Sequence, residues 1–201
     1  ISPSEAMTPE AIVVRSVRLP RFLAAAAAGG VLAMGGVVLQ GLLSNPLAEP
    51  YTMGIAAGAA FGGALGFLFN STMVTPMAFL GAIAALWMVY TIAHCGDGGS
   101  SAYLVLAGII TNAVLSAGVT FLKAIADDRL AAIVLWLMGS FSGASSTTAL
   151  ITWSSTVILA VPALIYGRQL DAVSLGEGQG SMLGINERRL RMILLYAASL
   201  A

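Results

Sequence analysis

The chain has 201 residues, of which 58% are hydrophobic and 9% are charged, and its basic and acidic side chains balance to a formal net charge of zero. An ordinary soluble domain carries roughly 25% charged residues, so a globule of this composition could not cover its surface with polar groups. The composition therefore predicts a polytopic membrane protein surrounded by lipid, and it excludes the basic footprint of a nucleic-acid-binding protein.

Apolar runs long enough to cross a bilayer follow a polar tail, and two arginines, Arg18 and Arg21, stand just before the first run. A crossing helix needs about 20 residues. Alternation at period two is absent, and backbone groups in lipid must be paired within their own segment, so we expect helices. We predict an all-α fold, a polytopic transmembrane helical bundle. Its five crossing segments are expected at residues 22–43, 51–69, 75–93, 102–126 and 147–167.

Two further apolar stretches are too short to cross. Residues 130–139 lie between the fourth and fifth runs and fit a re-entrant or interfacial helix. A sixth run begins at Leu190 and the sequence stops within it, after twelve residues. We therefore expect the chain to be a piece of a longer protein.

Glycines recur every four residues along the second run, at Gly54, Gly58, Gly62 and Gly66. A smooth face of this kind lets helix backbones approach closely in lipid. We interpret the stripe chiefly as a helix-packing surface. The alternative is a fixed contact beside a moving pathway.

Polar residues gather on one face of the fourth run. Asn112, Ser116 and Thr120 stand four residues apart, with Thr111 beside them. The stripe fits the lining of a water-filled route, since polar groups at membrane depth usually face a cavity or the bundle interior. It fits equally well hydrogen bonds across helices with no part in transport. No ionisable residue stands in the middle of a run, and Lys123 is close enough to an end to reach the interface.

The polar segment 168–191 separates the fifth and sixth runs. It contains apolar residues that a plain linker does not need. Leu175, Met182 and Leu183 fit one face of a short helix near 174–183, suited to a groove on a partner protein. The glycines of this segment argue against that helix, because each costs about 1 kcal/mol relative to alanine in a helix interior. The alternative is a surface loop that folds back on its own protein.

No group of residues in the sequence predicts catalysis. His94, Cys95 and Asp97 stand close together, but a structural metal site needs about four ligands. The glycine-rich residues 96–99 lack the lysine of a phosphate-binding loop. We expect no metal, no cofactor and no enzyme activity in this chain. If ATP drives the protein, a separate chain binds it.

Basic residues leave the orientation open. Strict alternation of crossings puts five basic residues on one side and four on the other, which decides nothing under the positive-inside rule. The first set is Arg15, Arg18, Arg21, Lys123 and Arg129, and the second is Arg168, Arg188, Arg189 and Arg191.

Three blocks of sequence, in order, resemble the permease subunits of bacterial ABC importers for iron–siderophore complexes, haem and vitamin B12. The first runs from Arg18-Leu-Pro-Arg21 through Gln40-Gly to Asn45-Pro-Leu-Ala-Glu-Pro50 and Gly54. The second joins Leu104-Val-Leu-Ala-Gly108 to Trp136-Leu-Met-Gly-Ser-Phe141. The third joins Leu175-Gly-Glu177 to Leu183-Gly-Ile-Asn186.

The resemblance implies an incomplete permease domain over 1–201, holding the second to sixth helices and the start of the seventh of about ten. Such permeases lie in the bacterial inner membrane, and two copies form a dimer. They pair with two ATP-binding subunits and a periplasmic substrate-binding protein. The resemblance places 1–21 on the extracytoplasmic side, as a tail leading into the first complete span.

The resemblance also assigns roles to particular residues. Arg18 and Arg21 fall on the motif whose arginines meet acidic residues of the binding protein. The resemblance places segment 168–189 in the cytoplasm, where it would seat in a groove of the ATPase. Ser100 and Ser101 fall at a cytoplasmic gate beside the stripe of Asn112, Ser116 and Thr120. The residues assigned to coupling are Leu175, Gly176, Glu177, Leu183 and Gly184.

Two positions depart from the family pattern, which usually has alanine at Gly180 and an acidic or polar residue at Gly178. The leading hypothesis is a permease that hands a metal chelate inward by alternating access, driven by ATP. The alternative is an ATP-independent secondary carrier or channel. The sequence does not distinguish haem from a ferric siderophore or a corrinoid as the cargo.

Overall fold

The computed structural model describes residues 9–51, 53–94, 101–176 and 178–200, and the described residues are helices joined by turns and loops, without strands. The all-α prediction is confirmed. The long helices are α2 (Leu19–Leu43), α4 (Val74–His94), α5 (Ser101–Ala124) and α7 (Ser146–Ile165). The others are α1 (Pro9–Val13), α3 (Ile55–Phe69), α6 (Leu130–Met138), α8 (Gly167–Ser174), α9 (Gln179–Met182) and α10 (Glu187–Leu200).

Four stretches of the described chain are long and apolar enough to cross a membrane: Pro9–Leu43, Ser71–Ala93, Ser101–Ala124 and Ser146–Ile165. The first is longer than the predicted run, because α1 continues through a π-helical turn at Val14–Arg18 into α2. The predicted second crossing is shorter than expected. Gly54 has φ +69° and forms the N-cap of α3, so the helix begins only at Ile55 and has 15 residues.

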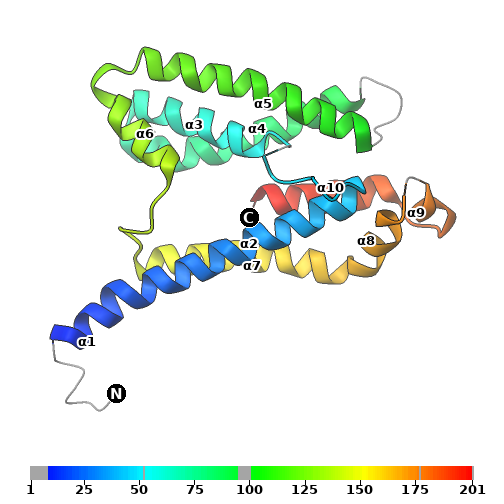
Figure 1. The fold of residues 1–201 in the computed structure, drawn as a ribbon, viewed down its shortest axis with the longest axis horizontal. Coiled ribbons are helices and arrows are strands. Elements are labelled where there is room, and N and C mark those ends of the chain that lie inside the picture. The colour runs from blue at the N-terminus through cyan, green and yellow to red at the C-terminus, as the bar shows by residue number, and fades with distance from the viewer. Residues whose placement is uncertain (1–8, 52, 95–100, 177, 201) are drawn as a thin grey trace.

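The helices form two layers (Figure 1). One layer contains α3, α4, α5 and α6, and the other contains α2, α7, α8 and α10. In the second layer α2 and α7 run parallel, since Thr156 Oγ1 donates to Ala27 O at 3.3 Å and Ser44 Oγ donates to Val173 O, beyond α7, at 3.2 Å. The main apolar core joins the layers where α10 packs on α4 and α2, around the fully buried Leu39, Val89 and Leu194.

The glycine face of α3 packs on α4. A side chain at Gly58 would meet the backbone oxygen of Gly81, and one at Gly62 would meet that of Met77. A Cβ at Gly66 would lie 2.7 Å from the Cα atom of Val74. The packing interpretation is therefore confirmed for these three residues. Gly54 also packs closely, but against α5 and not α4, since a Cβ there would lie 3.2 Å from Thr111 Cγ2 and 3.4 Å from Gly108 O.

Helix α6 has nine residues and is too short to cross a bilayer, as the sequence predicts. Its Ile133 is fully buried in a small second core with Ala64 of α3 and Leu122 of α5. Helix α7 then begins with a capping box, in which Ser145 Oγ accepts from Thr148 N at 3.2 Å. The capping box satisfies backbone N–H groups at the start of α7 and so defines where this helix begins.

The sequence left a short helix near 174–183 open against a loop, and the structure does not contain that single helix. Helix α8 ends at Ser174, and only the four residues of α9 are helical beyond it. Gly176 has φ +134° and Gly178 has φ +83°, a region that L-residues with side chains rarely adopt. The glycines thus turn the chain between two short helices instead of continuing one.

Candidate functional site

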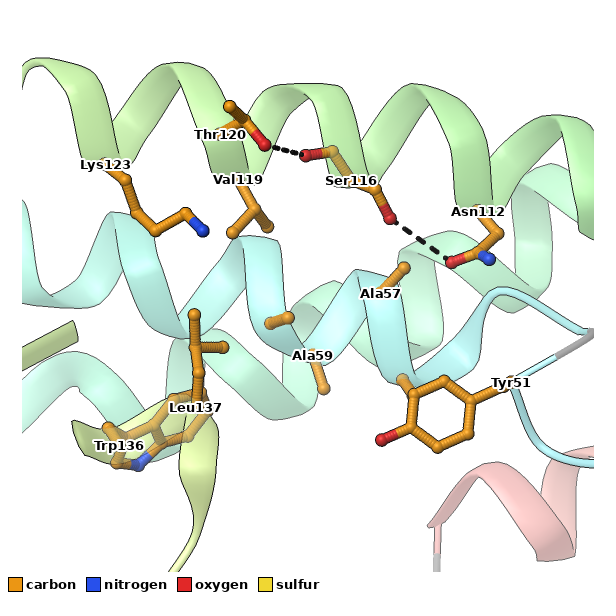
Figure 2. A pocket seen from close by; sticks show the side chains of 12 residues that line it. Tyr51, Ala57, Ala59, Asn112, Ser116, Val119, Thr120, Lys123, Trp136 and Leu137 are labelled. Atoms are coloured by element: carbon orange, nitrogen blue, oxygen red, sulfur yellow. Dashed lines mark hydrogen bonds between the residues drawn. The ribbon is translucent and has the colours of Figure 1, made fainter. Parts of the chain in front are cut away.

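An open hollow of about 620 Å³ lies between α3, α5 and α6 (Figure 2). Small residues of α3, Ala56, Ala57, Ala59 and Ala60, form one wall and leave room between the helices. Helix α6 contributes Trp136 and Leu137, and the chain before α3 contributes Tyr51. The remaining wall is the polar face of α5, formed by Asn112, Ser116, Val119, Thr120 and Lys123.

The stripe predicted on α5 faces this hollow. Ser116 Oγ donates to Asn112 Oδ1 at 3.4 Å, and Thr120 Oγ1 donates to Ser116 O at 3.0 Å (Figure 2). These bonds stay within α5, whereas the packing interpretation required partners on other helices. Thr111 behaves differently, because it is fully buried and lies against Gly54 on another face of the helix.

Sequence reasoning missed the contribution of Tyr51 and Trp136 to the hollow. Trp136 reaches it because Gly63 of α3 has no side chain, and a Cβ there would lie 2.5 Å from the indole ring. The ring also meets Phe67 edge-on, with centroids 6.3 Å apart. Lys123 lines the hollow as well, although the sequence suggested that it reaches toward the interface. The sequence did single out Trp136, because it begins the second part of the second block that resembles the permease family.

The two arginines at the start of α2 differ in their contacts. Arg21 donates from Nε to Phe141 O at 3.1 Å and from Nη2 to Ser142 O at 2.9 Å. It therefore ties α2 to the loop between α6 and α7. Arg18 lies in the π-helical turn and is exposed.

The segment after α8 presents apolar side chains outward. Leu175, Met182 and Leu183 are 77%, 83% and 68% exposed. Gly184 has φ +75°, which ends this turn before α10. Glu177 lies outside the described residues. The exposed side chains have the apolar character that a partner surface requires, though not on a single helix.

Helix α10 holds this segment in place through Glu187. Its Oε1 accepts from Ser181 N at 3.1 Å, and its Oε2 pairs with Arg191 at 3.5 Å. A Cβ at Gly180 would lie 2.9 Å from Glu187 Oε1 and 2.8 Å from Val173 Cγ2. The departure from alanine at this position therefore allows a close approach of α9 to α8 and α10.

Ser101 begins α5 and is 7% exposed, and its Oγ accepts from Arg191 Nη2 at 3.2 Å. The end of α5 is thereby linked to α10. Ser100, Cys95, Asp97 and the glycine-rich residues 96–99 lie outside the described residues. Among the described residues, no three His, Cys, Asp or Glu side chains come together as a metal site.

Comparison with known proteins gives consistent matches. The model of the FecCD transport family matches residues 2–201. The hemin transport system permease of Yersinia pestis is 36% identical over 90% of this chain and 58% of its own length. The cobalamin import system permease of Halobacterium salinarum is 32% identical over 94% of this chain and 52% of its own.

A solved ABC transporter of the metal-chelate type, in an inward-facing conformation, has a TM-score of 0.83 and 32% identity, and the match covers 95% of this chain and 63% of that one. The chain thus spans little more than half the length of the curated relatives it matches.

Proposed function

The chain belongs to the FecCD transport family, and from this premise we propose that it is part of the permease of an ATP-driven importer for a metal chelate. The observation that carries the proposal is the family match over nearly the whole chain. The chain is a multi-pass membrane protein, which in a bacterium lies in the inner membrane. The proposed partners are a second permease copy, two ATP-binding subunits that hydrolyse ATP, and a periplasmic binding protein.

The positions of the two docking regions support this assembly. Arg18 and Arg21 stand at the start of α2, and α8 and α9 lie at the far end of the same helix (Figure 1). At about 1.5 Å per residue, the 25 residues of α2 extend roughly 37 Å, enough to cross a hydrocarbon core of about 30 Å. We assign residues 1–21 to the extracytoplasmic side and 168–189 to the cytoplasm, so the two partners bind on opposite sides.

In this arrangement the hollow between α3, α5 and α6 forms part of the cargo route. Asn112, Ser116 and Thr120 supply polar groups along it. Ser101 at the other end of α5 is joined to Arg191 of α10, which follows the coupling segment. We propose that closure of the ATPases moves α8 and α9, that α10 carries this movement to the Ser100–Ser101 gate, and that alternating access results.

The proposal predicts that the double substitution Met182→Asp and Leu183→Asp in the full-length permease abolishes retention of the ATP-binding subunit. Burying two carboxylates in an apolar groove is costly, and apolar anchors at an interface each contribute about 2 kcal/mol or more. The measurement is co-purification in mild detergent, at the same yield of permease. The control, Met182→Leu with Leu183→Met, keeps the volume and should retain the subunit.

If the wild-type permease never retains an ATP-binding subunit yet still supports uptake, the importer proposal fails in favour of an ATP-independent carrier. Normal retention by the aspartate variant, with wild-type uptake, would instead remove the coupling role of Met182 and Leu183.

The extracytoplasmic assignment predicts that Arg18→Glu weakens binding-protein affinity severalfold and flattens its dependence on salt. Charges at the rim of an interface steer docking, and salt screens them. The control is Arg168→Glu at the opposite end, which should leave the affinity unchanged. Arg21 is unsuited to this test, because its replacement also releases the loop that carries Phe141 and Ser142. An unchanged Kd for Arg18→Glu, at low and high salt, would contradict the assignment.

A further inference from the structure

The hollow is lined by hydrogen-bond donors and by one charged group. Of its twelve lining residues, six are alanine, valine or leucine, and none is aspartate or glutamate. The polar half comprises Tyr51, Asn112, Ser116, Thr120, Lys123 and Trp136. Lys123 can only donate, and so can the indole nitrogen of Trp136. The lining as a whole suits a ligand rich in acceptor atoms.

The donors converge from several elements. Figure 2 shows the ammonium group of Lys123 extending from α5 over the hollow, and the hydroxyl of Tyr51 pointing into it from the chain before α3. At the other end of the same face of α5, the oxygen of Asn112 accepts from Ser116, so the amino group of this side chain is the part that can donate to a ligand.

The neighbouring charges do not neutralise Lys123. Asp127 and Asp128 follow it in sequence but are exposed beyond the end of α5, and neither lines the hollow. Within the described residues no ion pair joins Lys123 to a carboxylate. Arg129 is directed elsewhere, donating to the backbone oxygens of Phe67 and Leu68 at the end of α3. The single formal charge inside the hollow is therefore positive.

The positive charge of Lys123 in the hollow indicates which kind of ligand the hollow could bind. Lys123 is half-buried on an open hollow, one residue before the end of α5, so its ammonium group keeps access to water. Ionisable groups that line a cavity in membrane proteins commonly mark the route of a charged substrate. Lys123 lies at the end of α5 nearest α6, the same end of the bundle at which α2 begins (Figure 1). A cargo arriving from the side of Arg18 would meet Lys123 early on its route.

We infer that the cargo is an anionic metal chelate, carrying carboxylate, catecholate or similar oxyanion groups, and that Lys123 receives it, with the Tyr51 hydroxyl and the Asn112 amino group as further donors. The inference rests on the proposed importer function and narrows its substrate class. It excludes uncharged chelates as the preferred cargo.

The test uses the full-length permease with its ATP-binding subunits and binding protein in proteoliposomes. Four probes are compared: haemin, with two propionates; a ferric tris-catecholate of charge 3−; a neutral ferric tris-hydroxamate; and cyanocobalamin, without net charge. We expect ATP-dependent uptake of an anionic probe. A hydrogen bond to a charged group contributes about 1.5–3 kcal/mol, so Lys123→Gln should lower that uptake roughly tenfold or more.

Lys123→Glu should lower uptake further, and Lys123→Arg should restore it. Retention of the ATP-binding subunit should be unchanged in all three variants, which separates the effect from misfolding. Preferred uptake of a neutral probe, or wild-type uptake of an anionic probe by Lys123→Glu, overturns the inference while leaving the importer intact. If the wild-type complex moves no probe with ATP, the importer proposal itself fails.

Discussion

Substituting alanine for Gly62 should destabilise the full-length permease, although alanine is the better helix former by about 1 kcal/mol. The new Cβ would meet the backbone oxygen of Met77, and it would lie 3.2 Å from Ala78 Cα. Backbone atoms cannot rotate away as the end of a side chain can, so α3 and α4 must separate. Overpacking of this kind costs roughly 1–3 kcal/mol or more. The measurements are the thermal unfolding midpoint and the monodisperse fraction in detergent.

Gly36→Ala on α2 is the matched control. Both glycines are inside apolar helices, but a Cβ at Gly36 has no other atom within 4 Å outside its own helix. Helix propensity then acts alone, and this variant should be neutral or slightly more stable than the wild type. The two alanine substitutions should therefore shift the unfolding midpoint in opposite directions. A midpoint raised by Gly62→Ala would mean that α3 and α4 are not packed through their backbones.

The sequence was sufficient to predict the long helices α2, α4, α5 and α7 because the hydrophobic requirement of a crossing segment is strong and local. The shared face of Asn112, Ser116 and Thr120 was also predictable, since residues four apart lie above one another on a helix. The break between α8 and α9 was undecided in the sequence. Apolar spacing favoured one helix and Gly176 and Gly178 opposed it, and the backbone preference of glycine prevailed.

Other features depend on contacts between distant segments and carry no local signal. Tyr51 and Trp136 meet the same hollow only because α3 is narrow at its alanines and at Gly63. The sequence interpretation placed Arg21 on a docking motif before an apolar run. In the structure its guanidinium donates hydrogen bonds to backbone oxygens about 120 residues later. The first residue of α3 likewise depends on Gly54, because its left-handed backbone caps the helix and packs against α5.

The coupling segment is joined to the membrane helices through a small set of contacts on the inner face of α8. Leu170 fits over Gly41 of α2, where a Cβ would lie 2.9 Å from its Cδ1. One turn further, Val173 is 1% exposed and its backbone oxygen accepts from Ser44. Met182 and Leu183 lie beyond α8, at the end of α9, and are exposed to a partner. If the proposed ATP-binding subunit binds there, its movement would reach α2 through Leu170 and Val173.

Leu170→Ala should accordingly separate ATP hydrolysis from uptake. The change removes side-chain atoms that lie over Gly41 but leaves Met182 and Leu183 in place, so the ATP-binding subunit should remain bound and active. Substitutions along a coupling route alter coupling by about 0.5–2 kcal/mol, which corresponds to a roughly two- to thirtyfold lower ratio of chelate taken up to ATP hydrolysed. Both quantities would be measured on the same proteoliposomes.

Leu164→Ala is the control, because it removes the same atoms from a side chain that is 83% exposed on α7. It should leave the ratio of uptake to hydrolysis unchanged. Leu170→Met, which keeps the volume, should restore most of the wild-type ratio. An unchanged ratio in Leu170→Ala, with the complex intact, would show that movement of α8 reaches the membrane helices by another route. Another route in the described part of the chain runs through Glu187 and Arg191 to Ser101 of α5, because α10 also holds the coupling segment.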